Sequence, residues 1–314
     1  MSTLSYADVK AAADRVAGHV RPVAVAPGDP DGPALALEFL QHTGTFKARG
    51  AQNFLLAHRE SGTLPDAGVT LASGGNAGLA NAWAAGRLGV PATVFLPETA
   101  PPVKVARLRG YGAEVRLAGS EYAEAAAACE EFADRTGALR SHAYDHPLIA
   151  AGAGTLVDEI LERSSSTPDT LIVSVGGGGL FAGVATAAHH HGVRTVAVEP
   201  EHCRALHAAL EAGAPVDVPV DSVAADSLGA RRATPLALAA ARASGAPSVL
   251  VPDAEIVRAR RALWDGHRVA VEHAAATALA ALTSGAYVPE DGERVTVVLC
   301  GANTDPTDLA GPAS

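Results

Sequence analysis

The chain has 314 residues, of which 48% are hydrophobic, and this is enough to bury one large core or two moderate ones. Its net charge of −10, with no basic stretch interleaved with aromatic residues, argues against a nucleic-acid-binding protein. No apolar run is long enough to cross a membrane, and three widely separated cysteines indicate neither a disulfide framework nor a zinc site.

The first twenty residues predict an amphipathic helix rather than a signal peptide. They carry Asp8 and Asp14 and lack the continuous apolar segment of a signal sequence. Together with the cysteine usage, this predicts a cytoplasmic protein.

Residues 42–52, HTGTFKARGAQ, combine a turn-like Thr-Gly-Thr with one of only three lysines in the chain. Lys47 follows Phe46 near the start of a segment, 44–60, that has a helical pattern, whereas the other two lysines lie in ordinary amphipathic helices. A solvated lysine on a helix surface is one interpretation. A lysine nucleophile, which must be partly desolvated to act as a free amine near neutral pH, is the other. Arg49 either supports Lys47 or stabilises its own helix in water.

From residue 69 onward, short apolar runs alternate with longer Ala- and Leu-rich segments of helical periodicity. The expected strands are residues 69–73, 92–97, 114–118, 139–144, 170–175, 193–199, 248–252 and 294–300. The expected helices are residues 76–89, 102–110, 120–136, 147–163, 179–191, 203–213, 234–245, 253–267 and 271–284. Continuously apolar strands are typical of parallel sheets covered on both faces. We therefore predict an α/β protein with two open, doubly wound lobes, a mostly parallel sheet in each and an active site in the cleft between them.

Two strand-to-helix junctions are candidate anion sites. In LASGGNAGLANAWAA (71–85), Ser73 or Asn76 could be a helix cap, or the free N–H groups at the helix start could hold a carboxylate. In SVGGGGLFAGVATAA (174–188), four glycines form either a flexible turn or a phosphate-binding loop of backbone amides. Glu199 ends the next strand, so nucleotide binding is the alternative there. One anion site in each lobe suggests a ligand with two anionic ends.

Two further features carry weaker signals. Cys300 ends a buried strand, where a cysteine is most often a small hydrophobic residue but could hydrogen-bond a ligand ring. His189, His190 and His191 end a helix and point in different directions, which favours stabilisation of the helix end over metal chelation.

Together these segments resemble the fold-type II, tryptophan-synthase-like pyridoxal-phosphate (PLP) enzymes, and within them the serine/threonine dehydratase and serine racemase group. The similar segments are TGTFKARGA for the Schiff-base lysine, SGGNAG for the substrate and cofactor loop, GGGGL for the phosphate loop and LCGAN for the strand end beside the pyridine nitrogen. They occur in the family's order over nearly the whole chain. The resemblance implies a large PLP-binding domain of residues 1–66 plus 145–314 and a small domain of residues 67–144.

The resemblance also implies residue roles. Lys47 would form the Schiff base with PLP and act as the base at Cα, Phe46 would lie beside the ring, and Asn76 would hydrogen-bond its 3′-oxygen. Backbone amides would hold the phosphate at Gly176, Gly177, Gly178, Gly179 and Leu180. The substrate carboxylate would be held by Ser73 with the amides around Gly74, Gly75 and Ala77. Cys300 would face the pyridine nitrogen, and a neutral thiol there favours prompt loss of a β-substituent.

The implied activity is a PLP-dependent ammonia-lyase in amino-acid metabolism. It would convert a β-hydroxy amino acid such as L-serine or L-threonine to a 2-oxo acid and ammonia. Serine racemisation is disfavoured, because the racemases have a second serine where this chain has Gly74. A lyase acting on a hydroxyaspartate or phenylserine type of substrate is an alternative, since Arg231 and Arg232 could select an acidic side chain or be solvated. A non-PLP anion-binding α/β protein is the alternative from another class.

The resemblance implies further partners. Glu199 matches a cation ligand of the racemases, but Cys203 and Ala205 fall at the later ligand positions, so we expect no divalent metal and consider a monovalent cation. A homodimer acting on a small amino acid, without nucleic acid or membrane, is implied. With no regulatory domain after residue 314, we expect no amino-acid feedback.

Overall fold

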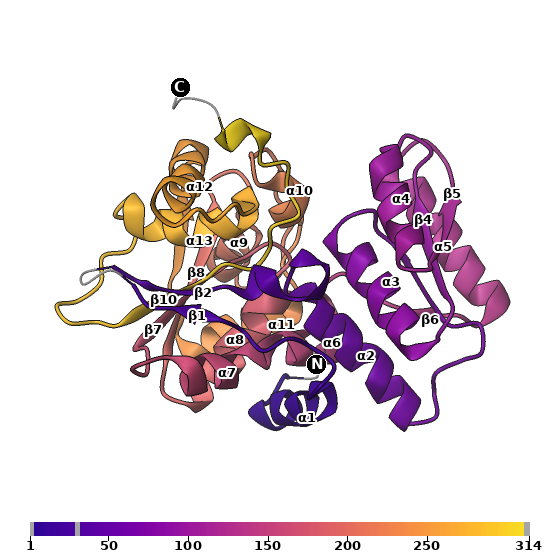
Figure 1. Cartoon of the computed structure of the whole chain (residues 1–314), viewed down its shortest axis with the longest axis horizontal. Coiled ribbons are helices and arrows are strands. Elements are labelled where there is room, and N and C mark those ends of the chain that lie inside the picture. Colours follow the sequence, from indigo (N-terminus) through magenta and orange to yellow (C-terminus); the bar gives the residue numbers. More distant parts are fainter. Residues whose placement is uncertain (1–2, 29–31, 311–314) are drawn as a thin grey trace.

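The computed structural model describes residues 3–28 and 32–310 and arranges them in two α/β lobes (Figure 1). The larger sheet has the order β1 (Val25–Ala26), β2 (Ala34–Ala36), β10 (Val295–Val298), β7 (Thr170–Ser174), β8 (Arg194–Pro200) and β9 (Ser248–Val251). The smaller sheet has the order β5 (Glu114–Leu117), β4 (Ala92–Leu96), β3 (Val69–Ala72) and β6 (Leu139–Arg140). Neighbouring strands are parallel except β1 and β2. The predicted fold class is therefore confirmed.

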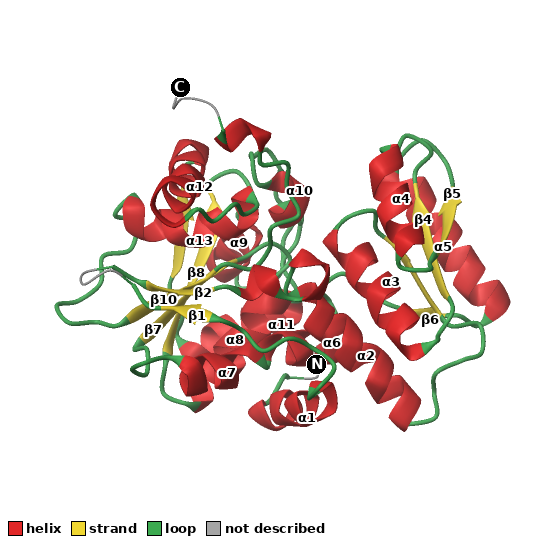
Figure 2. Cartoon of the chain, in the orientation of Figure 1, coloured by secondary structure: helices red, strands yellow, loops and turns green. Residues whose placement is uncertain are grey.

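Helices cover both faces of each sheet (Figure 2). The smaller lobe carries α3 (Asn76–Leu88), α4 (Pro102–Gly110) and α5 (Tyr122–Thr136). The rest of the chain carries α1 (Tyr6–Val16), α2 (Lys47–Glu60), α6 (Pro147–Gly154), α7 (Leu156–Arg163), α8 (Gly179–His190), α9 (Ala205–Ala212), α10 (Ala225–Leu228), α11 (Pro235–Ser244), α12 (Asp253–His267) and α13 (His273–Thr283). Short 3-10 turns are η1 (Glu38–Leu40), η2 (His42–Gly44) and η3 (Thr307–Leu309).

The central strands are apolar along their whole length because helices pack on both of their faces. Every residue of β7 is buried, as is every residue of β10. Val297 of β10 lies opposite Ile172 of β7, and Leu71 of β3 lies opposite Val94 of β4. Consecutive burial of this kind is typical of parallel sheets.

The junction between the lobes is built by α2 and α6, which lie between the two sheets in Figure 1. Helix α2 packs against α6 on one side and α3 on the other. The first residue of α2 therefore lies where both lobes can contact a ligand.

Several predicted boundaries are wrong. The strand expected at 139–144 ends at Arg140, because the following residues leave the sheet edge after pairing with β3. The helix expected at 147–163 is two helices that meet at Thr155. The segment expected to be helical from Gly44 begins α2 only at Lys47, since Thr43 has a positive φ of 64° and Thr45 is extended. Short strands β1 and β2 were not predicted, because two or three residues carry no clear period.

No helix in residues 3–28 and 32–310 has both the length and the apolar character needed to cross a membrane.

Candidate active site

A cavity of about 710 Å³ lies between the lobes and is lined by segments that are far apart in the sequence. Its wall includes all the candidate site residues, namely Phe46, Lys47, Ser73, Gly74, Gly75, Asn76, Ala77, Gly176, Gly177, Gly178, Gly179, Leu180 and Cys300. They converge because three strands, β3, β7 and β10, end at this side of the lobes. Helix α2 begins at the same side. The tertiary structure thus brings together every predicted site residue, and their individual roles stay predictions.

Lys47 is the first residue of α2 and is partly buried in the cavity wall. Its Nζ lies 4.3 Å from the centroid of the Phe46 ring. Among the residues that the structure describes, no carboxylate forms an ion pair with it. Burial lowers the pKa of Lys47, although Cys300 and Glu272 act in the opposite direction. The amine is therefore easier to deprotonate than that of a solvated lysine.

The glycine loop between β7 and α8 has a conformation that excludes side chains. Gly178 has a φ of 96°, in the left-handed region. A Cβ on Gly178 would lie 2.3 Å from the Cβ of Ala237, and one on Gly177 would lie 2.2 Å from the ring of Tyr144. Four glycines at this junction are thus required by backbone conformation and by close packing, not by flexibility.

The amides of this loop are available to a ligand. Within residues 3–28 and 32–310, the N–H groups of residues 176–180 find no acceptor in the protein. They lie at the N-terminus of the twelve-residue helix α8, whose dipole adds positive potential. This arrangement can hold a dianion by backbone donors.

A second set of free amides begins α3. Gly75 is the N-cap and no side chain caps the helix, so the interpretation of Ser73 or Asn76 as a cap is wrong. The uncapped N–H groups lie in the cavity wall and can donate hydrogen bonds to a carboxylate. A Cβ on Gly74 would lie 2.6 Å from Cδ2 of Leu96, so a side chain at this position needs Leu96 to move.

Asn76 is oriented by a buried carboxylate that the sequence analysis did not single out. Its Nδ2 donates to Glu272 Oε1 at 2.9 Å, and its Oδ1 accepts from Asn303 Nδ2 at 2.8 Å. Ser227 Oγ donates to Glu272 Oε2 at 2.7 Å. Because Asn76 belongs to the smaller lobe and its partners to the larger one, these bonds also tie the lobes together.

Cys300 follows β10 and is buried at the base of the cavity. Its Sγ lies 3.6 Å from Ser174 Oγ. Burial raises the pKa of the Cys300 thiol to about 11, so it stays neutral at physiological pH. The structure places all three cysteines in buried positions as free thiols.

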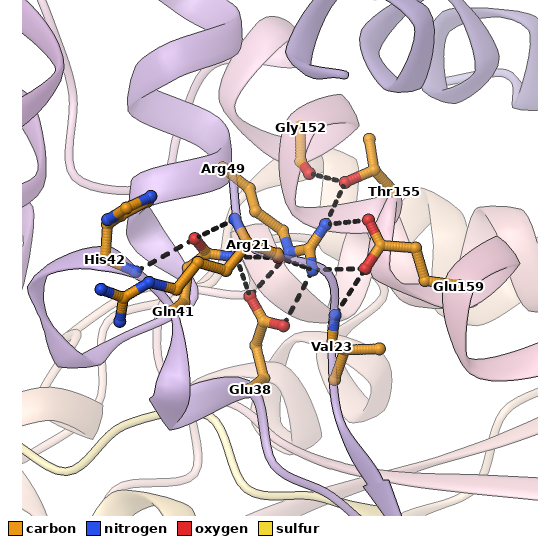
Figure 3. Close-up of polar contacts among 9 residues, drawn as sticks. All are labelled: Arg21, Val23, Glu38, Gln41, His42, Arg49, Gly152, Thr155 and Glu159. Atoms are coloured by element: carbon orange, nitrogen blue, oxygen red, sulfur yellow. Dashed lines mark hydrogen bonds and ion pairs between the residues drawn. The ribbon is translucent and has the colours of Figure 1, made fainter. Parts of the chain in front are cut away.

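Arg49 is completely buried, so the alternative in which it stabilises its own helix in water is wrong. Its guanidinium forms ion pairs with Glu38 and Glu159 beneath the start of α2 (Figure 3). Periodicity alone could not reveal this, because both carboxylates come from segments distant in sequence.

The two arginines of the loop before α11 have different environments. Arg231 lines the cavity, whereas Arg232 pairs with Asp217, with Nε 2.8 Å from Oδ1. Arg231 forms no ion pair with a carboxylate in the part of the chain that the structure describes.

Glu199 is fully buried at the end of β8 and points toward α9. Its Oε1 and Oε2 accept hydrogen bonds of 2.8 Å each from the backbone N–H groups of Leu206 and His207. Desolvation raises the pKa of Glu199 to about 7. The carboxylate thus accepts hydrogen bonds from the start of α9 and does not line the cavity. The alternative of nucleotide binding therefore lacks the acidic residue that it requires.

Two of the three histidines at the end of α8, His190 and His191, share Tyr6 as an aromatic neighbour. Tyr6 stacks on His190, with ring centroids 3.8 Å apart, and His191 Nε2 lies 2.8 Å from Asp158 Oδ1. In the described residues, no group of three or more His, Cys, Asp or Glu side chains is placed to hold a metal ion.

Sequence reasoning missed Glu272, Asn303 and Tyr144. The segment VEH (271–273) contained the only available signal for Glu272, a carboxylate directly before a helix. Asn303 and Tyr144 lie in loops, and only their packing against Asn76 and Gly177 reveals their place at the site.

A family model, curated sequences and solved structures show which proteins this chain is similar to. The family model described as "Pyridoxal-phosphate dependent enzyme" matches residues 33–301. L-threonine ammonia-lyase of Geobacter sulfurreducens is 40% identical over 270 residues, which are 85% of this chain and 66% of that protein. Phenylserine dehydratase of Ralstonia pickettii is 40% identical over 276 residues, 87% of this chain and 83% of that protein. The structure of maize serine racemase superposes with a TM-score of 0.90 at 27% identity, covering 98% of this chain and 96% of the other.

Proposed function

The chain belongs to the family of pyridoxal-phosphate-dependent enzymes, and from this premise we propose that it is an ammonia-lyase. It eliminates water from a small β-hydroxy amino acid such as L-serine or L-threonine, and hydrolysis of the released enamine takes up one water and frees ammonia, so that the net products are a 2-oxo acid and ammonia. The observation that carries the proposal is the position of Lys47 in one cavity with two sets of free backbone amides. One set suits a phosphate and the other a carboxylate.

The residues of the cavity fit the cofactor. PLP carries a phosphate, an aldehyde that condenses with amines, and a conjugated ring that withdraws electrons from Cα. The glycine loop at the start of α8 offers amide donors for the phosphate, and a Cβ at Gly177 or Gly178 would collide with its neighbours. Lys47 offers the amine, and the neutral thiol of Cys300 suits an uncharged ring nitrogen.

Lys47 and the amides at the start of α3 act directly on the substrate. The amides of residues 74–77, with Ser73, bind its carboxylate and so orient the Cα–H bond. Lys47 Nζ, whose pKa is lowered by burial, takes the Cα proton as a free amine. Holding both groups in one geometry removes much of the entropic cost of the reaction.

Cys300 and Asn76 set the electronic environment. Cys300 cannot supply a proton to the ring nitrogen at physiological pH, because burial raises its pKa to about 11. A weaker electron sink favours reactions that expel a β-substituent at once. Glu272 holds the Asn76 amide group in a fixed direction in the cavity wall, from which it would donate to a ring oxygen of the bound cofactor.

Racemisation is not part of the proposal. A proton donor on the face of the substrate opposite Lys47 would be needed, and Gly74 has no side chain to supply it. The contact between a Cβ at Gly74 and Leu96 supports this exclusion.

A lyase for β-hydroxy amino acids with an acidic side chain is the second candidate. Arg231 favours it, since this cavity cation has no carboxylate partner among the described residues. A phenylserine-type substrate is the apolar alternative, since one relative with 40% identity is a phenylserine dehydratase. Assays of 2-oxo acid formation from L-threonine, L-serine, 3-hydroxyaspartate and 3-phenylserine, with wild type and Arg231→Met, distinguish them. A loss confined to hydroxyaspartate supports the acidic substrate.

We further propose the domain limits, the location and partners of the protein, and an ion site. The large domain comprises residues 1–66 plus 145–314 and the small domain residues 67–144. The protein is a cytoplasmic homodimer that binds a small amino acid and no nucleic acid, supported by its net charge of −10 and by its family. A monovalent cation lies beside Glu199, supported by the full burial of this carboxylate. Light scattering and activity with potassium or tetramethylammonium test the dimer and the cation.

The decisive experiment is spectroscopic. Purified protein should carry a yellow cofactor that borohydride fixes covalently to Lys47, with loss of activity. The attachment site is identified by peptide mass spectrometry. Protein that stays colourless with added PLP, or that attaches it elsewhere, would contradict the proposal.

A further inference from the structure

We propose that Arg49 is a positioning residue that holds the first turn of α2, and with it the side chain of Lys47, in the direction needed at the cavity. The inference rests on the proposed function, in which Lys47 carries the cofactor. It assigns to Arg49 a role in the reaction in addition to a role in stability.

Lys47 and Arg49 project from opposite sides of the same helical turn. Successive residues of an α-helix are separated by about 100°, so two residues two positions apart differ by about 200° around the axis and by about 3 Å along it. Lys47 lines the cavity, and Arg49 is buried on the other side of the helix. An anchor at Arg49 therefore fixes both the rotation and the axial position of the turn that carries Lys47.

The anchor is a fully bonded guanidinium (Figure 3). Nε and Nη2 donate to Glu38 Oε1 and Oε2 at 2.6 and 3.0 Å. Nη1 and Nη2 donate to Glu159 Oε1 and Oε2 at 2.7 and 2.8 Å. Nη1 also donates to Thr155 Oγ1 at 3.1 Å, and Nη2 donates to the carbonyl of Arg21 at 3.2 Å. Two carboxylates thus bind the planar guanidinium from two directions, each with two hydrogen bonds.

These partners belong to separate parts of the larger lobe. Glu38 lies in η1 directly after β2, Glu159 lies in α7, and Thr155 lies where α6 meets α7. Glu159 Oε2 also accepts from the backbone N–H of Val23 at 2.7 Å. Arg49 consequently ties the start of α2 to the edge of the sheet and to the helix pair at the junction of the lobes.

The start of α2 has few other polar restraints. Its N-cap, Phe46, has no side-chain capping bond, and the first turn contains no acidic residue. The other contacts of this segment are apolar packing against α6, where a Cβ on Gly50 would lie 2.7 Å from the carbonyl oxygen of Ile149, and backbone contacts to the end of β10, including the bond from Phe46 N to Cys300 O at 3.0 Å. Without Arg49, the first turn would keep this packing and these backbone contacts but would lose the ion pairs that fix its rotation.

Arginine is needed because a lysine ammonium cannot reproduce two forked contacts in different directions. Burial alone would lower the pKa of Arg49, but Glu38 and Glu159 raise it well above its ordinary value. Burial also raises the pKa of Glu38, and Arg49 acts in the opposite direction.

Small rotations matter at the cavity. An atom about 8 Å from the helix axis moves by about 1.4 Å when the helix rotates by about 10°. A displacement of about 1 Å at a reacting group can reduce the rate by about 100-fold. We therefore expect Arg49→Lys to lower kcat by about 10- to 100-fold, with KM changed less than about three-fold.

The experiment compares Arg49→Lys with Arg15→Lys in the PLP-loaded, full-length protein. Arg15 is the matched control because it also bonds α2, at Asn53 and at Glu60, toward the other end of the helix. Both variants are assayed below their melting temperatures. The second readout is the pH titration of the bound cofactor's absorbance without substrate, which reports the environment of the Lys47 linkage.

Arg49→Lys should shift this spectroscopic midpoint and lower kcat, whereas Arg15→Lys should match wild type within about two-fold. Equal kcat and equal midpoints for the two folded, cofactor-loaded variants would overturn the inference. If Arg49→Lys does not fold, Glu159→Gln, which keeps the pair with Glu38, should shift the midpoint in the same direction, and no shift overturns the inference. A wild type that takes up no PLP defeats the proposed function, whereas an active wild type with an unaffected Arg49→Lys defeats this inference alone.

Discussion

Gly178→Ala is the substitution for which the structure makes the most quantitative prediction. Gly178 has a φ of 96°, and a left-handed conformation costs a residue with a Cβ roughly 1–2 kcal/mol. The new Cβ would lie 2.3 Å from the Cβ of Ala237, and relief of such overpacking costs roughly 1–3 kcal/mol. We expect the free energy of unfolding to fall by about 2–5 kcal/mol in total.

The matched control is Gly192→Ala. Gly192 also has a positive φ, of 71°, but no atom lies within 4 Å of its added Cβ. The control should therefore lose only the conformational cost, about 1–2 kcal/mol, and should bind PLP normally. Urea unfolding measures both losses, and equilibrium dialysis measures the dissociation constant of PLP.

PLP binding is the more specific readout. Relief of the clash must move the backbone of the loop, so the amides of residues 176–180 no longer converge on the phosphate. We expect PLP to bind at least about ten-fold more weakly to Gly178→Ala, which corresponds to about 1.4 kcal/mol. If Gly178→Ala binds PLP as tightly as Gly192→Ala, the assignment of this loop to the phosphate is refuted.

Three further predictions concern other residues. Lys47→Ala should lose the bound cofactor's yellow absorbance after dialysis and retain less than about 0.1% of activity, and absorbance that resists dialysis would disprove the assignment. Gly74→Ser alone should lower the free energy of unfolding by about 1–3 kcal/mol, because Leu96 must move, and its effect should be smaller when it is introduced into Leu96→Ala; thermal unfolding tests this, and an unchanged Tm for the single variant would contradict it. The pKa of Glu199 is raised from 4.5 to about 7, so its contribution to stability is fully present below pH 4.5 and is lost as pH rises through 7. Relative to Glu199→Gln, wild type should therefore lose up to about 3 kcal/mol between pH 4.5 and 8, and parallel urea-unfolding profiles would show that Glu199 does not titrate in this range.

Most of the fold was predictable because its signals are local. Continuous apolar strands and intervening helical periods identified the two parallel sheets, including β7 and β10. Boundaries were less accurate where tertiary contacts decide them. Leu139–Arg140 ends where its pairing with β3 ends, and the helix pair that meets at Thr155 gives no break in sequence periodicity.

The same division holds for the site. Lys47, the glycine loop at residues 176–179 and the turn at residues 73–77 were predictable because each is a short motif whose chemistry lies in its own backbone or side chain. Glu272 was not, because its importance comes from hydrogen bonds to Asn76 across the two lobes.

The sequence by itself determined the alternation of strands and helices, the two glycine-rich junctions and a lysine at a helix start, since each depends on residues adjacent in the chain. Only the tertiary structure decided that these segments share one cavity. It also decided the environment of Arg49, for which the local pattern allowed either a solvated cation or a support for Lys47. The reason is physical, because a guanidinium can be fully buried only where carboxylates from distant segments, here Glu38 and Glu159, converge on it.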